Sequence, residues 1–211
     1  MVRLLDAATQ GAVRDRSRII PRDFVLFSLT DDETFTSYGF TNFGEDVSVN
    51  VVLNGAGDVG NYAFYGDNAP LQSIDAIPLK IGLEVDTIQV VMNPLHPIVQ
   101  IMARGNEQAL RTARVQIFRG YLDPASMLLV ANPRSRFLGQ VNTAPERVAA
   151  VGGQSVRTIN VRSHTHEMTR TSPAKKSDET YKLRSGDRFG QYSGTAGKWE
   201  LWWGEVKGAT S

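Results

Sequence analysis

The feature that most constrains the fold is the regular recurrence of short β-prone segments along the chain. From Asp23 onward, apolar and aromatic residues alternate or cluster in runs that are separated by Gly, Pro and Asp. These runs follow one another about every eight to twelve residues, which is typical of β-sandwiches and barrels. Alternating strands and helices would need longer spacing. The sequence therefore predicts a mainly β fold, with one or two small tube-like β-barrel or sandwich domains.

The individual elements can be placed from the same pattern. Residues 4–16 are the best helix candidate because their apolar residues fall near helical spacing and Pro21 follows soon after. A short helical turn is expected at 106–112. The expected strands are 24–29, 34–40, 47–53, 62–66, 79–92, 98–103, 114–121, 127–131, 136–141 and 155–162.

Three regions follow from this division. We expect an N-terminal helical segment at 1–22, a β-rich region at 23–170 that could hold two interleaved domains, and a polar arm with a Trp-rich end at 171–211. The arm has no core signal at 171–178, so an extended or flexible conformation is expected there. Trp202 and Trp203 would point to opposite sides of a strand, so at least one is expected at an interface or in a second apolar layer.

Composition narrows the classes of function. The chain has 211 residues, with 23 basic and 22 acidic side chains and a net charge of +1, which gives no general reason to expect a nucleic-acid or membrane partner. It contains no cysteine, which excludes disulfides and thiolate chemistry and fits assembly in a reducing cytoplasm. Asp6 stands where a signal peptide has its apolar centre, so no secretion signal is expected.

Two motifs could suggest a cofactor or a metal. Gly55, Gly57 and Gly60 form a G-x-G-x-x-G pattern, but the aromatic, turn-rich sequence after it predicts a hairpin loop and no dinucleotide-binding helix. His164 and His166, beside Glu167, would share one face of a strand and could reach one metal ion. A third ligand is not evident, so hydrogen bonding at a strand end or subunit contact is preferred. We expect no cofactor, no metal and no catalytic residue.

Basic residues gather in the arm. They are Lys175, Lys176, Lys182, Arg184 and Arg188. Such a stretch is either a solvated loop or an electrostatic contact with an acidic partner or passing nucleic acid.

Several blocks of sequence carry a resemblance when taken together. They are I-D-A-I-P-L at 74–79, R-V-Q-I-F-R-G-Y-L-D-P at 114–124, R-F-L-G-Q-V at 136–141, S-H-T-H-E-M-T-R-T at 163–171, R-S-G-D-R-F at 184–189 and W-E-L-W-W-G at 199–204. The set resembles the baseplate hub, or tail-tip, family of long-tailed bacteriophages and prophages. His166 departs from the family pattern, which tends to have Arg there. Without cysteine, the iron–sulfur cluster of some hub proteins cannot be present.

The resemblance implies a structural virion protein without enzymatic activity. In the family, three copies with two tube-like domains each join a six-fold tail tube to a three-fold tip and line or close the DNA channel. The implied partners are further copies of the chain, the distal tail protein, the tape-measure C-terminus, the central tip or fibre protein and, transiently, DNA. The implied location is the virion tail tip, after synthesis in the host bacterial cytoplasm. The interface candidates are Trp199, Trp202, Trp203, Lys175, Lys176, Arg184, Asp187, Arg188, Phe189, His164 and Arg170.

Two alternatives stay open at this point. One is a distal tail protein, which forms a hexameric ring from the same kind of domain. The other is a small tail-associated hydrolase or carbohydrate-binding β domain, for which His164, His166 and Glu167 are the best site residues.

Overall fold

A computed structural model describes residues 6–15, 18–31, 34–53, 58–77, 85–105, 107–151, 153–169 and 177–192. The chain divides into two compact units, residues 1–169 and 170–211. The described part of the second unit contains one helix, α5 (Asp178–Lys182), followed by turns.

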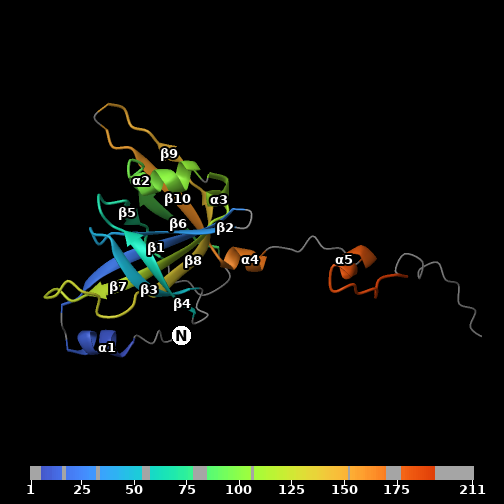
Figure 1. Cartoon of the computed structure of the whole chain (residues 1–211), viewed down its shortest axis with the longest axis horizontal. Coiled ribbons are helices and arrows are strands. Elements are labelled where there is room, and N and C mark those ends of the chain that lie inside the picture. The colour runs from blue at the N-terminus through green and yellow to red at the C-terminus, as the bar shows by residue number, and fades with distance from the viewer. Residues whose placement is uncertain are drawn as a thin grey trace, which may run out of the picture. The chain divides into compact units, whose positions relative to one another are not determined.

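The first unit is built mainly from strands (Figure 1). Its helical elements are α1 (Ala7–Arg14), α2 (Pro97–Gln100), the π-helical turn η1 (Ile101–Gly105), α3 (Glu107–Arg111) and α4 (Thr165–Thr169). Its strands are β1 (Ile20–Asp31), β2 (Thr34–Thr41), β3 (Val47–Leu53), β4 (Asp58–Tyr65), β5 (Leu71–Ile74), β6 (Thr87–Met92), β7 (Arg114–Leu122), β8 (Arg134–Thr143), β9 (Glu146–Arg147) and β10 (Val156–Ser163). No helix in the described ranges is long and apolar enough to span a membrane.

The ten strands form one mixed sheet. Their order is β3-β4-β2-β1-β7-β8-β10-β6-β5, with β9 paired beside β10. Only the β2–β4 pairing is parallel among the pairings of the described strands. The expected mainly β class is confirmed. The expected closed barrel is not found, because no pairing between described residues joins the end strands β3 and β5, and the sheet stays open.

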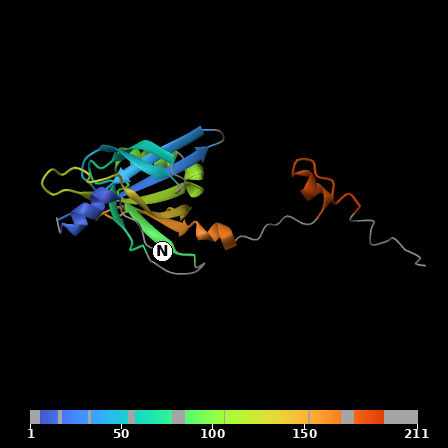
Figure 2. The same cartoon turned by 90° about the horizontal axis from the view of Figure 1, so that it is seen from below.

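Strand β1 is buried on both of its faces. Successive side chains of a strand point to opposite sides, and four in a row, Phe24, Val25, Leu26 and Phe27, are at most 1% exposed. Val25 and Phe27 enter a large core with β6, β7, β8, β10 and the helices α2 to α3. Phe24 and Leu26 enter a smaller core with β3 and β4, which curl over this face of the sheet (Figure 2).

An ion pair ties β1 to its neighbour β7. Asp23 and Arg119 face each other across the two strands. Arg119 Nε donates to Asp23 Oδ1 at 2.7 Å and Nη2 donates to Oδ2 at 3.2 Å, a two-point contact that fixes the register. The hydrogen bond to Asp23 raises the pKa of Arg119 above its ordinary value.

The chain between β6 and β7 is helical, and the strand expected at 98–103 is wrong. Pro97 occupies the first turn of α2, where its missing N–H is not needed. Val99, Met102 and Ala103 are at most 2% exposed. Their spacing of three and four residues places them on one helical face against the core.

Of two further expectations, one is wrong and one is confirmed. The segment 127–131, expected to be a strand, is a loop with one isolated bridge, between Leu122 and Leu129. The hairpin expected around the glycine pattern is confirmed, since Leu53 of β3 pairs with Asp58 of β4. Residues 54–57 lie outside the described ranges, and a strand follows them where a dinucleotide site needs a helix.

A glycine in β8 provides a test of this packing. Gly139 lies between β7 and β10, and a Cβ there would overlap the carbonyl oxygen of Arg162 and approach Phe137 Cε1 to 2.7 Å. We predict that Gly139→Ala lowers the free energy of unfolding by about 1–3 kcal/mol.

The matched control is Gly11→Ala in α1, where an added Cβ meets nothing within 4 Å. Because alanine favours a helix over glycine, this variant should be neutral or up to about 1 kcal/mol more stable. Thermal unfolding of both variants measures the difference. Equal stability of the two would contradict the packing described for β8.

Candidate functional site

The S-H-T-H-E segment lies where β10 ends. The His164 N–H donates to the carbonyl of Leu138 at 3.0 Å. Ser163 Oγ accepts from the Thr165 N–H at 3.4 Å and from its hydroxyl at 3.0 Å, as α4 begins. His164 therefore lies in a turn and His166 in a helix. The expectation that both histidines share one strand face is wrong, because the strand stops at Ser163.

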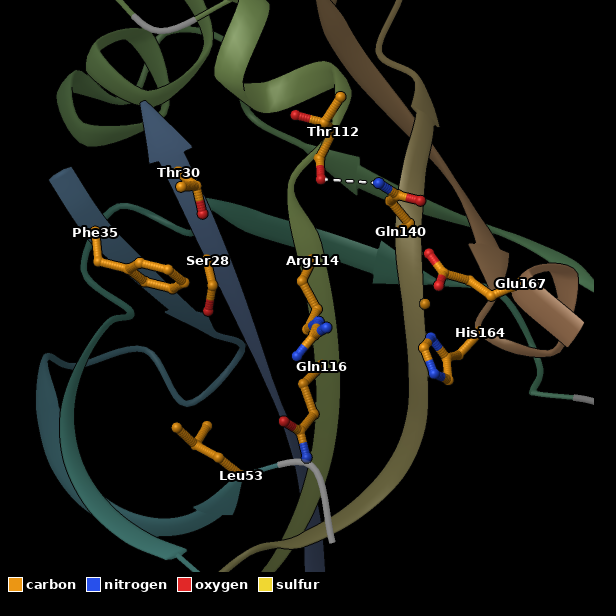
Figure 3. Close-up of a pocket in the computed structure, with 11 residues that line it drawn as sticks. Ser28, Thr30, Phe35, Leu53, Thr112, Arg114, Gln116, Gln140, His164 and Glu167 are labelled. Atoms are coloured by element: carbon orange, nitrogen blue, oxygen red, sulfur yellow. Dashed lines mark hydrogen bonds between the residues drawn. The ribbon is translucent and has the colours of Figure 1, made fainter. Parts of the chain in front are cut away.

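Two hollows adjoin this segment. The first, of about 280 Å³, is lined by residues from several strands and from the α4 region (Figure 3). The second, of about 240 Å³, shares Thr112, Gln140, His164 and Glu167 with the first. His166 lines only the second of these hollows. The segment that sequence reasoning singled out is thus the shared wall of two shallow surface depressions.

Hydrogen bonds fix the polar side chains in the first hollow. Gln140 Nε2 donates to the Thr112 carbonyl at 3.1 Å, from one wall of the hollow to another (Figure 3). Gln116, only 3% exposed, donates to the Val52 carbonyl at 3.2 Å and to Ser135 Oγ at 3.1 Å. These amides hold strands together, and the surface they present is polar and ordered.

The catalytic alternative gains no support from this geometry. A catalytic histidine needs a nucleophile within hydrogen-bond reach and a third group that orients its ring. Within the described ranges, the His164 ring makes no hydrogen bond or ion pair. Among the same residues, no group of three His, Cys, Asp or Glu side chains could hold a metal ion.

A third and larger hollow, of about 820 Å³, lies between α3 and the start of β9. Glu146 is its central charge: Oε1 accepts from Arg104 at 3.2 Å, and Oε2 accepts from Arg157. The Arg157 side chain is 9% exposed and also donates to the Ala144 carbonyl at 3.4 Å. Sequence reasoning missed this cluster because its members are far apart in the chain and form no local motif.

The R-S-G-D-R-F block lies in the second unit, where it ends α5. The Gly186 N–H donates to the Lys182 carbonyl at 3.0 Å, and both Ser185 (φ 55°) and Gly186 (φ 76°) are left-handed. Asp187 accepts from the Phe189 N–H at 2.9 Å and pairs with Arg184 at 3.3 Å. The block is a helix stop followed by a turn.

This turn brings two aromatic rings together. Phe189 meets Tyr181 edge-on, with 6.1 Å between ring centroids, and the Arg184 guanidinium lies 5.7 Å from the Tyr181 ring centroid. Phe189 stays 87% exposed. Residues 177–192 are helix and turn, whereas residues 171–176 of the stretch expected to be extended or flexible lie outside the described residues.

Of the remaining interface candidates, the structure describes Arg188, whose Nε lies 3.6 Å from Asp178 Oδ2. Those that lie outside the described residues are Arg170, Lys175, Lys176, Trp199, Trp202 and Trp203.

Comparison with known proteins shows a likeness of fold. No protein-family model matches the sequence, and no curated protein matches it. A solved chain from the "Virion of native gene transfer agent (GTA) particle" matches with a TM-score of 0.52. Over the matched residues, this chain shares its fold with part of that chain. The two are 14% identical, and the match covers 82% of this chain and 50% of the other, so this chain spans half the length of its match.

The cluster in the third hollow gives a stability prediction. Replacing Glu146 by Ala leaves the buried Arg157 guanidinium without its carboxylate, so the free energy of unfolding should fall by about 2–3 kcal/mol. Denaturant unfolding measures the change.

The control is Glu107→Ala, which breaks an ion pair with Arg111 in which both side chains are about two-thirds exposed (68% and 70%). Exposed pairs contribute little, so this loss should stay below about 0.5 kcal/mol. Equal losses in the two variants would show that Glu146 does not compensate a buried charge.

Proposed function

We propose that this chain is a structural protein of a phage-tail-like virion and that it acts as the baseplate hub at the tail tip. The observation that carries the virion part is the fold shared with the gene transfer agent chain over 82% of this sequence. The hub assignment rests on the combination of sequence blocks, above all S-H-T-H-E-M-T-R-T and R-S-G-D-R-F.

The described surfaces suit contacts with other proteins. The hollows beside His164 present fixed amides and the Arg114 guanidinium, which forms no ion pair within the described ranges. Because hydrogen bonds already hold the amides in place, they can bond to a partner without a large ordering cost.

The second unit offers an apolar anchor of a different kind. Leu183 and Phe189 are 88% and 87% exposed, yet the ring of Phe189 is already held against Tyr181. Ordered aromatic side chains are frequent hot spots of interfaces. We assign the same interface role to Trp199, Trp202 and Trp203, and propose further copies of this chain, the distal tail protein, the tape-measure C-terminus and the central tip or fibre protein as the partners.

One observation favours a second candidate, the hexameric distal tail protein. A hub trimer matches a six-fold tube because each copy supplies two tube-like domains. The described strands of this chain form one sheet. If each copy supplies one sheet, a ring of six copies would match the six-fold tube one to one. Closed rings are usual for assemblies of identical copies.

Quantitative mass spectrometry of purified particles tests the proposal. We predict that the chain is a stoichiometric particle component, at three copies per tail for the hub and six for the distal tail protein. The tube protein, counted in the same digest, is the internal control for copy number. Absence of the chain from purified particles would contradict the virion assignment, and a large variable copy number would contradict both ring models.

A further inference from the structure

One face of the sheet carries a row of polar side chains that crosses six strands. Residues directly opposite each other on paired strands point to the same side of the sheet. Six such residues are in register and lie on the face opposite the large core, where they form the polar row: Ser37, Ser28, Arg114, Gln140, Arg162 and Thr87. Only β8 separates Arg114 on β7 from Arg162 on β10, so their Cα atoms are about 10 Å apart.

The second layer of the fold leaves the middle of this row uncovered. β3 and β4 pack over Phe24 and Phe118 on the same face of the sheet, but Arg114 and Gln140 line the first hollow (Figure 3). Arg114 and Gln140 are exposed, and Arg162, which lines the second hollow, is partly exposed. A partner can therefore contact both arginines from outside the sheet.

The positive charge of the row is not compensated. The four neighbouring strands β7, β8, β10 and β6 contain six arginines and no acidic residue. Arg114 and Arg162 form no ion pair within the described ranges. Among the residues that line the first two hollows, Glu167 is the one acid, and it lies across β8 from Arg114 (Figure 3). We expect a partner at this surface to be acidic, because complementary charges orient protein contacts.

The complementary charge lies on the same chain, in two turns that meet beyond the end of β2. Asp46 Oδ1 accepts from the Gly66 N–H at 2.9 Å and from the Asp67 N–H at 3.2 Å, which holds the turn before β3 against the turn after β4. Glu45, Asp46 and Asp67 form this acidic tip. All three are exposed, and none forms an ion pair with another described residue. Neighbouring carboxylates repel each other, so the tip is stabilised by a cationic partner.

The acidic tip does not neutralise the polar row within one chain. Ser37 of the row and Thr41, where β2 ends, are four residues apart, which is about 13 Å along the strand. The two arginines lie farther away, because β7, β8 and β10 follow β1 on the side away from β2. Charges separated by more than about 8 Å are largely screened at physiological ionic strength. Both surfaces therefore keep their charge for a contact outside the chain.

We infer that the acidic tip of one copy binds the polar row of a second copy, with its carboxylates against Arg114 and Arg162. The row and the tip are different surfaces, so the contact is head to tail and makes a ring when the rotation between copies closes. This inference rests on the proposed ring-forming function, and it names the surfaces through which the ring is made.

The charge balance favours this partner over nucleic acid. Residues 170–211 hold 8 of the 23 basic and 5 of the 22 acidic side chains, which leaves the unit that carries the row with 15 basic and 17 acidic ones. Nucleic-acid binding is driven by the neutralisation of several phosphates. A unit with a small net negative charge and two unpaired arginines in the row suits a few carboxylates better.

Charge reversal tests the contact. The row variant carries Arg114→Glu and Arg162→Glu, and the tip variant carries Glu45→Lys and Asp67→Lys, while Asp46 is kept because it holds the two turns together. In each variant the row and the tip have the same sign of charge. Self-association of the full-length chain, measured by analytical ultracentrifugation, should therefore weaken about tenfold or more. An equimolar mixture of the two variants should associate again, since each row then meets a tip of opposite charge.

The matched control reverses two exposed arginines that belong to neither surface, with Arg18→Glu and Arg147→Glu. It changes the net charge as much as the row variant does, so it separates a local contact from a general effect of charge. Its self-association should equal that of the original chain. Thermal unfolding of all variants checks that each one folds.

Glu167→Gln should act in the opposite direction. The substitution removes the one carboxylate that lines the hollows beside the row and leaves every row residue in place. Self-association should become about twofold to tenfold tighter and should fall more steeply as salt is added. Unchanged or weaker association would contradict an electrostatic contact at the row.

The inference is overturned if the original chain stays monomeric at low salt, or if the mixture associates no better than either variant alone. It is also overturned if the row variant keeps its self-association and instead loses binding to a single-stranded oligonucleotide, which would make the row a nucleic-acid site. Copy number in purified particles tests the proposed function separately. A stoichiometric chain with a failed mixture leaves the function intact, and a restored mixture with no chain in particles leaves only the copy-to-copy contact.

Discussion

The fold depends on the burial of β1 on both faces. Phe24 packs edge-on against Phe64 on one side, at 5.2 Å between centroids, and Phe27 packs against Phe40 on the other, at 5.9 Å. A strand that is apolar on both faces needs a cover on each. On one face, β1 is covered by β3 and β4, two strands of the same sheet that curl over it. On the other face the helices from Pro97 to Arg111 and the strands β6 and β10 supply it.

Local sequence pattern was enough to find most strands, but not their arrangement. Alternating apolar or aromatic residues predict β2, β3 and β10, the continuous apolar run 24–29 predicts β1, and β-prone segments between turns predict β7 and β8. The strand β5 was missed, since Gln72 and Ser73 at its centre are exposed and leave no periodic signal. Ile98, Val99 and Ile101 favour a strand by propensity, and only burial of the helical face overrides this. The parallel β2–β4 pairing is non-local, so no pattern within either strand indicates it.

The candidate sites were predictable to different extents. His164 and the R-S-G-D-R-F block both stand out in the sequence. The structure places His164 in a turn after β10 and places the block where α5 ends. The Glu146 cluster and the left-handed backbone of Met127 could not be predicted from the sequence. The cluster consists of residues that are far apart in the chain and meet only on folding, and a methionine gives no sequence signal for a left-handed conformation.

The most direct measurement is cryo-electron microscopy of tail tips from particles that carry this chain. The account predicts a ring of this chain between tube and tip, with three-fold symmetry for a hub and six-fold symmetry for a distal tail protein. A map of intact tails without density for this chain would contradict the central claim that it is a structural part of the virion.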